Sequence, residues 1–114
     1  MQNFSGMYMW HYVSNENKIK GPKENQQYLV CYESSTREGS AWKMLLAIWY
    51  EKGARINLRD SKGACHKFDV KVDGFYIINE FDDQGDLFFR IPNVRYWTAI
   101  PEPAINPDDV LTVV

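Results

Sequence analysis

The sequence predicts a mainly β protein: a single twisted antiparallel sheet of about five to seven strands, with at most short helices. Runs rich in aromatic and β-branched residues alternate with turn clusters along the chain. Asp73-Gly74 lies between two such runs, and an Asp-Gly pair in that position is a strong hairpin signal. The length of 114 residues fits a single globular domain, expected over residues 1–114. A small α+β fold is the alternative.

Two strands are expected near the N-terminus. Trp10, Tyr12 and Val13 close an opening strand, and a polar stretch broken by Gly21-Pro22 follows it. Residues 27–34 then carry apolar side chains on both faces of an extended segment. Because a strand that is apolar on both faces is typically covered on both sides, we expect this one to lie centrally in the sheet.

The segment 41–50 allows two interpretations. Its Ala, Lys, Met and Leu residues favour a helix, with Ser40 as a cap and Gly53 as a stop. The run is apolar almost all round, however, and its final Ile-Trp-Tyr favours a pleated surface. We therefore expect a strand, with the helix as the alternative.

Residues 66–73 show the clearest alternation in the chain. Phe68, Val70 and Val72 fall on one face and charged side chains on the other, which predicts a half-buried strand with one wet face. Asp73-Gly74 leads directly into a second strand pattern. We therefore expect these two strands to form a hairpin.

The remaining elements follow from turn residues. Residues 82–86 form a second turn that returns the chain into the strand 87–91. Pro92-Asn93 interrupts the chain before a last strand over 94–100. Residues 104–114 are expected to be a short helical or frayed tail, since a capped helix start is followed by β-branched residues.

Composition indicates a soluble, cytoplasmic protein. The formal net charge is −2, which argues against a polyanion-binding chain. Two isolated cysteines, Cys31 and Cys65, are typical of reduced thiols, and a single disulfide is the alternative. The first residues do not resemble a signal peptide, and no window is apolar enough to span a bilayer, so we expect no membrane contact.

No motif in the sequence supports catalysis, a cofactor or a metal. Cys65 and His66 are neighbours and would point to opposite faces of a strand, which is unfavourable for shared metal ligation. Residues 82–86 lack the ligand order of a calcium loop. Glycines are scattered and form no phosphate-binding loop. We expect a protein that is not an enzyme and that uses no cofactor.

The segment around Trp97 is the most distinctive candidate site. Strand alternation predicts Val94, Tyr96 and Thr98 on one face and Arg95, Trp97 and Ala99 on the other. We expect Trp97 to be largely buried. The alternative is a recognition surface formed by Tyr96, Trp97, Arg95 and Glu102.

The chain resembles a family of short proteins. Residues 93–103 (NVRYWTAIPEP) are similar to the ending of domain-of-unknown-function family 551, Val-x-His/Tyr-Trp-x-Pro-Leu-Pro-Glu-Pro. Upstream, Trp10, Val13-Ser14, Pro22 and Tyr28-Leu29-Val30 resemble its opening pattern, and residues 47–50 its middle strand. The resemblance implies an origin in a phage or prophage region, and it implies no enzymatic activity.

These observations favour a non-catalytic binding or accessory module whose partner is another protein. The alternative is a nucleic-acid-associated module that uses the strand bearing Lys67 and Lys71, although net acidity makes nucleic acid an unfavoured partner. A small enzyme is the third hypothesis. We expect the chain to be a monomer or a weak homodimer.

Overall fold

The computed structural model describes residues 9–36, 39–82 and 86–100. In these residues every regular element is a strand and none is a helix. The strands are β1 (His11–Tyr12), β2 (Gln27–Thr36), β3 (Gly39–Tyr50), β4 (Arg55–Arg59), β5 (Cys65–Asp69), β6 (Gly74–Ile78), β7 (Phe88–Arg90) and β8 (Val94–Ala99). The segment 41–50 lies within β3, so the preference for a strand over a helix is confirmed.

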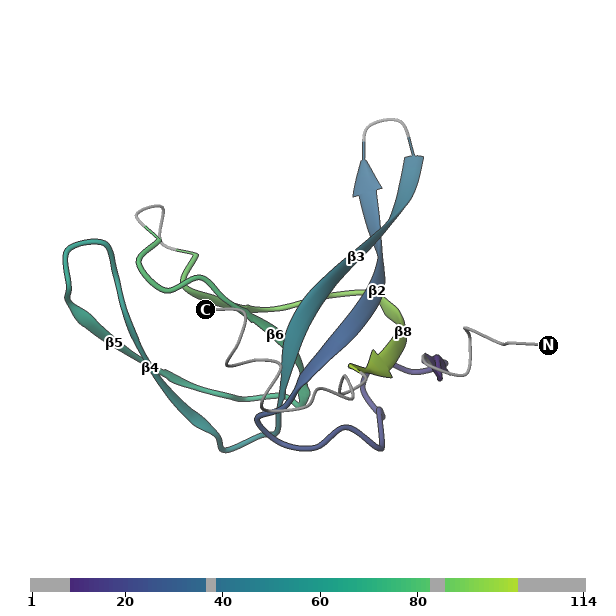
Figure 1. The fold of residues 1–114 in the computed structure, drawn as a ribbon, viewed down its shortest axis with the longest axis horizontal. Helices are drawn as coiled ribbons and strands as arrows, with labels where there is room; N and C mark the ends of the chain where they lie inside the picture. Colours follow the sequence, from purple (N-terminus) through teal and green to yellow (C-terminus); the bar gives the residue numbers. More distant parts are fainter. Residues whose placement is uncertain (1–8, 37–38, 83–85, 101–114) are drawn as a thin grey trace, which may run out of the picture.

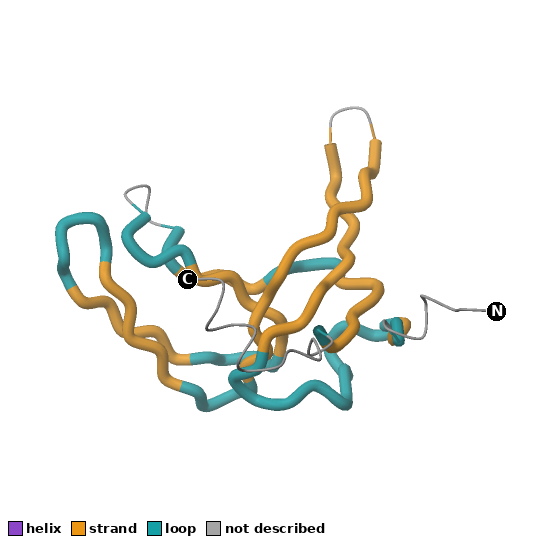
Figure 2. The backbone as a smooth tube through the Cα atoms, viewed as in Figure 1, coloured by secondary structure: helices purple, strands orange, loops and turns teal. Residues whose placement is uncertain are grey.

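The predicted fold class is confirmed. Six strands form an antiparallel sheet in the order β1-β8-β2-β3-β6-β7, and β4 and β5 add a two-stranded antiparallel sheet (Figure 1). β2 has the expected interior position, between β8 and β3. Strands and their connections account for the whole described chain, as Figure 2 shows. Figure 1 also shows β2 and β3 rising together as a long hairpin beyond the rest of the sheet.

The predicted hairpin at Asp73-Gly74 is wrong. β5 pairs with β4, whereas β6 pairs with β3. The Asp73 carboxylate accepts the backbone N–H of Lys52 at 2.7 Å, which ties the segment after β5 to the turn that follows β3. Gly74 is buried, and a Cβ at this position would collide with the Arg90 side chain. Close packing, and not a turn, explains the glycine.

The second predicted turn is consistent with the observed pairing. β6 and β7 are antiparallel neighbours, with Tyr76 opposite Arg90 and Ile78 opposite Phe88. Residues 83–85 of this connection lie outside the described residues, as do the predicted tail at 104–114 and Glu102. The predicted break at Pro92-Asn93 separates β7 from β8, which crosses to the other side of the sheet and pairs with β2 and β1.

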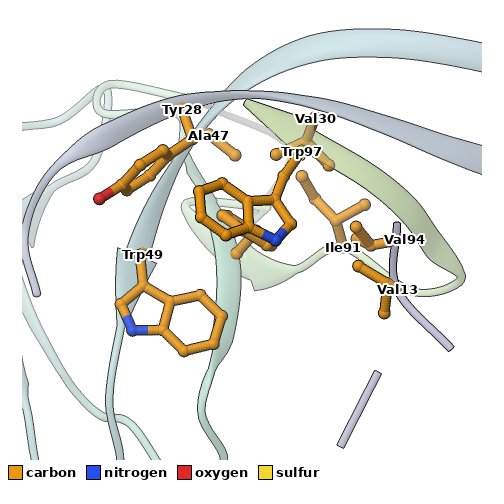
Figure 3. Packing of buried hydrophobic residues seen from close by; sticks show 9 residues of the cluster. Val13, Tyr28, Val30, Ala47, Trp49, Ile91, Val94 and Trp97 are labelled. Atoms are coloured by element: carbon orange, nitrogen blue, oxygen red, sulfur yellow. The ribbon is translucent and has the colours of Figure 1, made fainter. Parts of the chain in front are cut away.

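One face of the six-stranded sheet, here called the inner face, carries the main core. Val30 from β2, Trp49 from β3 and Trp97 from β8 lie on it (Figure 3). The other buried members of this cluster are Val13, Tyr28, Ala47, Phe75, Ile91 and Val94. The segment after β1 covers the cluster. Gly21 has a φ of +114°, and a Cβ there would lie 3.2 Å from the Trp97 ring, so only glycine permits this approach.

The strict alternation predicted around Trp97 is wrong, because β8 contains a β-bulge. Cys31 of β2 pairs with Tyr96, but Tyr32 pairs with Val94, so Arg95 is an extra residue. Val94 and Trp97 consequently both enter the inner core, whereas strict alternation had placed them on opposite faces. The expected burial of Trp97 is confirmed, because only 6% of this residue is exposed.

The opposite face, here called the outer face, is covered over one half. Ile48 and Tyr50 of β3 and Tyr76 of β6 project there and pack against the β4–β5 hairpin and its flanks. Tyr76 stacks on Phe88 with ring centroids 4.7 Å apart, and its hydroxyl donates to the Val72 carbonyl oxygen at 2.6 Å. Burial raises the pKa of both Tyr50 and Tyr76; for Tyr50 the Glu24 carboxylate adds to the effect.

Cys31 and Cys65 are both free. Cys31 lies in β2 and Cys65 begins β5, so the two thiols belong to different sheets. The structure contains no helix, within the residues that it describes, that is long and apolar enough to cross a membrane.

Candidate functional site

The uncovered half of the outer face carries a group of exposed apolar side chains, called the aromatic patch below. Its backbone frame is a row of paired residues that crosses four strands. Tyr12 of β1 lies opposite Tyr96 of β8, Tyr96 opposite Cys31 of β2, and Cys31 opposite Met44 of β3. Because paired residues project from the same face, these side chains are neighbours. The patch consists of Trp10, Tyr12, Trp42, Met44, Leu46 and Tyr96, all of them exposed.

Strand alternation explains why these side chains share a face. In β3 the odd-numbered Ala47 and Trp49 are buried on the inner face, so the even-numbered residues project outward. Of these, Trp42 and Met44 are each 58% exposed. In β8 the bulge at Arg95 interrupts the alternation, and beyond it Tyr96 projects outward while Trp97 projects inward.

The aromatic patch is hollowed at its centre. A small residue, Cys31, lies between Tyr96 and Met44, and with Trp10 these residues line an open hollow of about 410 Å³. Tyr96 also contacts the rings of Tyr12, at a centroid distance of 5.4 Å, and Trp42, at 6.2 Å. These ring contacts hold Tyr96 in place although it remains 37% exposed. The site therefore presents a partly pre-arranged apolar surface.

A pair of charged side chains lies at the rim of the patch. The Arg95 guanidinium lies 3.8 Å from the Glu33 carboxylate, an ion pair between β8 and β2. No charged side chain lines the central hollow in the described part of the chain. The surface can thus bury apolar area, and among the described residues no carboxylate, imidazole or cation lines its centre.

The structure distributes the four predicted site residues differently. Tyr96 belongs to the aromatic patch, and Arg95 lies at its rim. Trp97 belongs to the inner core, where the His11 ring stacks on it at 4.2 Å. Glu102 lies outside the described residues.

Most of the aromatic patch was not predicted. Trp42, Met44 and Leu46 come from the segment that was predicted only as a strand, and Tyr12 was predicted only as part of the opening strand. Alternation within residues 41–50 could have grouped the three even-numbered side chains. Which of the two faces receives a cover depends on connections elsewhere in the chain.

A second hollow, of about 370 Å³, lies beside the turn between β4 and β5. Its Asp60 carboxylate accepts the backbone N–H groups of Lys62 at 2.9 Å and Ala64 at 3.0 Å, and it pairs with His66 Nε2 at 2.8 Å. The hydrogen bond with His66 is the main reason that the pKa of Asp60 is lowered, and the backbone donors contribute to the same effect. These contacts fix the turn, and they account for the displaced pKa without a catalytic role.

In β5, the strand proposed for nucleic-acid contact, the cation Lys67 and the ring of Phe68 lie on opposite faces. Lys67 lies opposite Asn57 and lines an exposed hollow with Arg55 and Asp69. Its neighbour Phe68 points the other way, with its ring 5.4 Å from that of Phe88. A base-stacking site needs a cation and a ring on one surface, and β5 does not supply both. Binding of nucleic acid stays the alternative hypothesis.

Comparison of this chain with models of known protein families, with curated proteins and with solved structures found no match.

Proposed function

We propose that this chain is a non-catalytic binding module and that a partner protein docks on the aromatic patch. The observation that carries the proposal is the exposure of Trp10, Tyr12, Trp42, Met44, Leu46 and Tyr96 on one sheet face. Single exposed apolar residues are ordinary, but a contiguous group marks an interaction surface. Aromatic residues and methionine are also the types enriched in protein interfaces.

The chemistry of the patch favours a protein over a nucleic acid. A nucleic-acid surface requires cations that neutralise phosphates beside its stacking rings. Here the cation at the rim, Arg95, is paired with Glu33. An apolar side chain of a partner would instead fit the hollow over Cys31, between Tyr96 and Met44. Met44 can adjust its unbranched side chain to such an anchor.

A binding role without chemistry agrees with the titratable groups as well. Tyr50, Asp60 and Tyr76 have displaced pKa values, and all three lie outside the aromatic patch. Two of them are buried under the β4–β5 hairpin, and the third holds a turn. The phage or prophage origin implied by the resemblance to domain-of-unknown-function family 551 is part of this proposal.

Site-specific photo-crosslinking tests the proposal. A photoreactive phenylalanine analogue at Tyr12, which is 66% exposed, should capture one protein in cells that naturally express the chain. The same analogue at Val72, which is exposed outside the patch, is the matched control and should not capture it. The captured protein is then purified, and its affinity for the full chain is measured by calorimetry.

Docking on the patch predicts that Tyr12→Ser weakens this affinity at least about tenfold, which corresponds to about 1.4 kcal/mol. Val72→Ser should leave the affinity unchanged. Equal affinity of the wild type and Tyr12→Ser would contradict the proposal. Crosslinking to nucleic acid from Tyr12 would replace it with the alternative.

A further inference from the structure

The edge of β3 is open along much of its length. β3 has 12 residues and pairs with β2 over residues 39–48. On its other side it pairs with β6 only over residues 48–50. Between residues 40 and 47, no strand in the described ranges lies along that second side. This edge belongs to the part of the hairpin that rises beyond the sheet in Figure 1.

Backbone hydrogen bonds of Trp49 identify which groups face the open edge. The Trp49 N–H donates to the Gln26 carbonyl oxygen at 3.0 Å, and the Trp49 carbonyl oxygen accepts the Asn25 N–H at 2.7 Å. Trp49 therefore directs its backbone toward the β2 side. Because successive residues of a strand direct these groups to alternate sides, Trp42 and Met44 direct theirs toward the open edge.

This edge differs from the two ends of the sheet. The terminal strands β1 and β7 have only two and three residues, and short edge strands resist pairing with other chains. The open edge of β3 is longer, and it carries the exposed apolar side chains of Trp42, Met44 and Leu46. A long apolar edge is a favourable site for the addition of another strand.

We propose that a second copy of this chain pairs with β3 along this edge, antiparallel and about a two-fold axis at Trp42. An antiparallel edge is self-complementary under such an axis, because each residue pair occurs twice. Trp42 then lies opposite Trp42 of the second copy, and Ser40 opposite Met44. The backbone N–H and C=O groups of these residues complete the hydrogen-bond ladder between the two copies.

Charge and space disfavour the two registers that lie further along β3. An axis at Lys43 would place two like charges directly opposite each other, which is unfavourable. An axis at Met44 would bring Ser40 of the second copy to Ile48, where Tyr76 of β6 already pairs. With the axis at Trp42, Lys43 faces Ala41 and the incoming strand stops short of β6.

The pairing would join the outer faces of the two copies. A two-fold axis perpendicular to the sheet keeps paired side chains on one face, so the two aromatic patches become continuous across Trp42 and Met44. This inference does not depend on the proposed docking function. Tyr12→Ser, which tests docking, should leave self-association unchanged, so the two proposals can fail separately.

A charge-swap experiment on the full chain tests the register. Sedimentation velocity of the wild type should show the mass of two chains as concentration rises. Trp42→Lys alone and Trp42→Glu alone should each raise the dissociation constant at least about tenfold, since each places like charges on the axis. An equimolar mixture of the two variants should recover the dimer, because opposite charges then meet. Val72→Lys, on an exposed residue away from β3, is the matched control and should dimerise as the wild type does.

Circular dichroism and thermal unfolding should show that both Trp42 variants fold, since Trp42 is more than half exposed. A wild type that stays monomeric at about 1 mM would overturn the proposal, because even millimolar affinity would then populate the dimer. Retained dimerisation of the single variants would overturn it too. So would failure of the mixture to recover the dimer.

Discussion

The two halves of the outer face share one strand, β3, and differ in what lies over them. Toward its end, Ile48 and Tyr50 are covered by the β4–β5 hairpin and pack with Tyr76 and Val70. Toward its start, Trp42, Met44 and Leu46 follow the same alternation and are exposed. The local pattern is equally apolar in both halves, so apolar character alone does not determine burial.

Chain connectivity explains the difference. The β4–β5 hairpin is part of the connection between β3 and β6, two strands that pair only over residues 48–50 of β3. The backbone contacts between Gly53 and Val70, and between Ala54 and Val70, hold the base of the hairpin at that end of the sheet. A short hairpin anchored there covers its own end of the face. The other end of the face stays exposed.

Truncation of a ring in the covered half gives the largest expected effect. Tyr76→Ala removes a buried side chain that stacks on Phe88 and contacts Tyr50. We expect a loss of about 3–5 kcal/mol in the free energy of unfolding, as for other large buried rings. Chemical denaturation measures it, and a midpoint that scarcely moves would show that the hairpin does not cover this half.

A smaller change in the same residue separates its hydroxyl from its ring. Tyr76→Phe keeps the ring and removes the hydrogen bond to the Val72 carbonyl oxygen, at an expected cost of about 1 kcal/mol. Because burial raises the pKa of Tyr76, the fold favours the neutral phenol. The contribution of the neutral Tyr76 phenol to the free energy of unfolding is complete below the unfolded-state pKa of about 10. This contribution is lost as pH rises through the folded-state pKa. The variant should therefore lose less stability than the wild type in denaturation series taken above about pH 10.

The smallest effect is expected in the uncovered half. Tyr12→Ala removes a ring that is mostly exposed and that contacts the ring of Tyr96 on the patch. The free energy of unfolding should change by no more than about 0.5 kcal/mol. The same denaturation series serves as the measurement. A loss similar to that of Tyr76→Ala would remove the distinction between the halves.

Local sequence patterns predicted the strands well because alternation and turn residues act over a few positions. The strand at 41–50 and the break at Pro92-Asn93 are examples. Strand partners were harder to predict, as Asp73-Gly74 shows. That pair has the composition of a tight hairpin, yet the glycine is needed because Arg90, distant in sequence, packs against it.

The candidate site was predicted only in part, for a related reason. Tyr96 and Arg95 were identified from their segment, but the bulge that orients them depends on pairing with β2. Trp42 and Met44 were predicted only as part of a strand, because their segment is apolar on both faces and does not indicate which face is exposed. Their exposure follows from the limited reach of a hairpin that begins after Tyr50, and no pattern within residues 41–50 contains that information.

The four indoles of the chain divide into two optical populations. Trp49 and Trp97 are enclosed in the inner core, and Trp49 Nε1 has no hydrogen-bond partner among the described residues. Trp10 and Trp42 are open to solvent on the outer face. A water-soluble quencher such as acrylamide should reach the outer pair and spare the inner pair while the protein is folded. Blue-shifted, unquenched emission from Trp49 and Trp97 then reports that the core is intact. Protection of Trp10 and Trp42 from the quencher would report that a partner has bound, and neither measurement needs an added label.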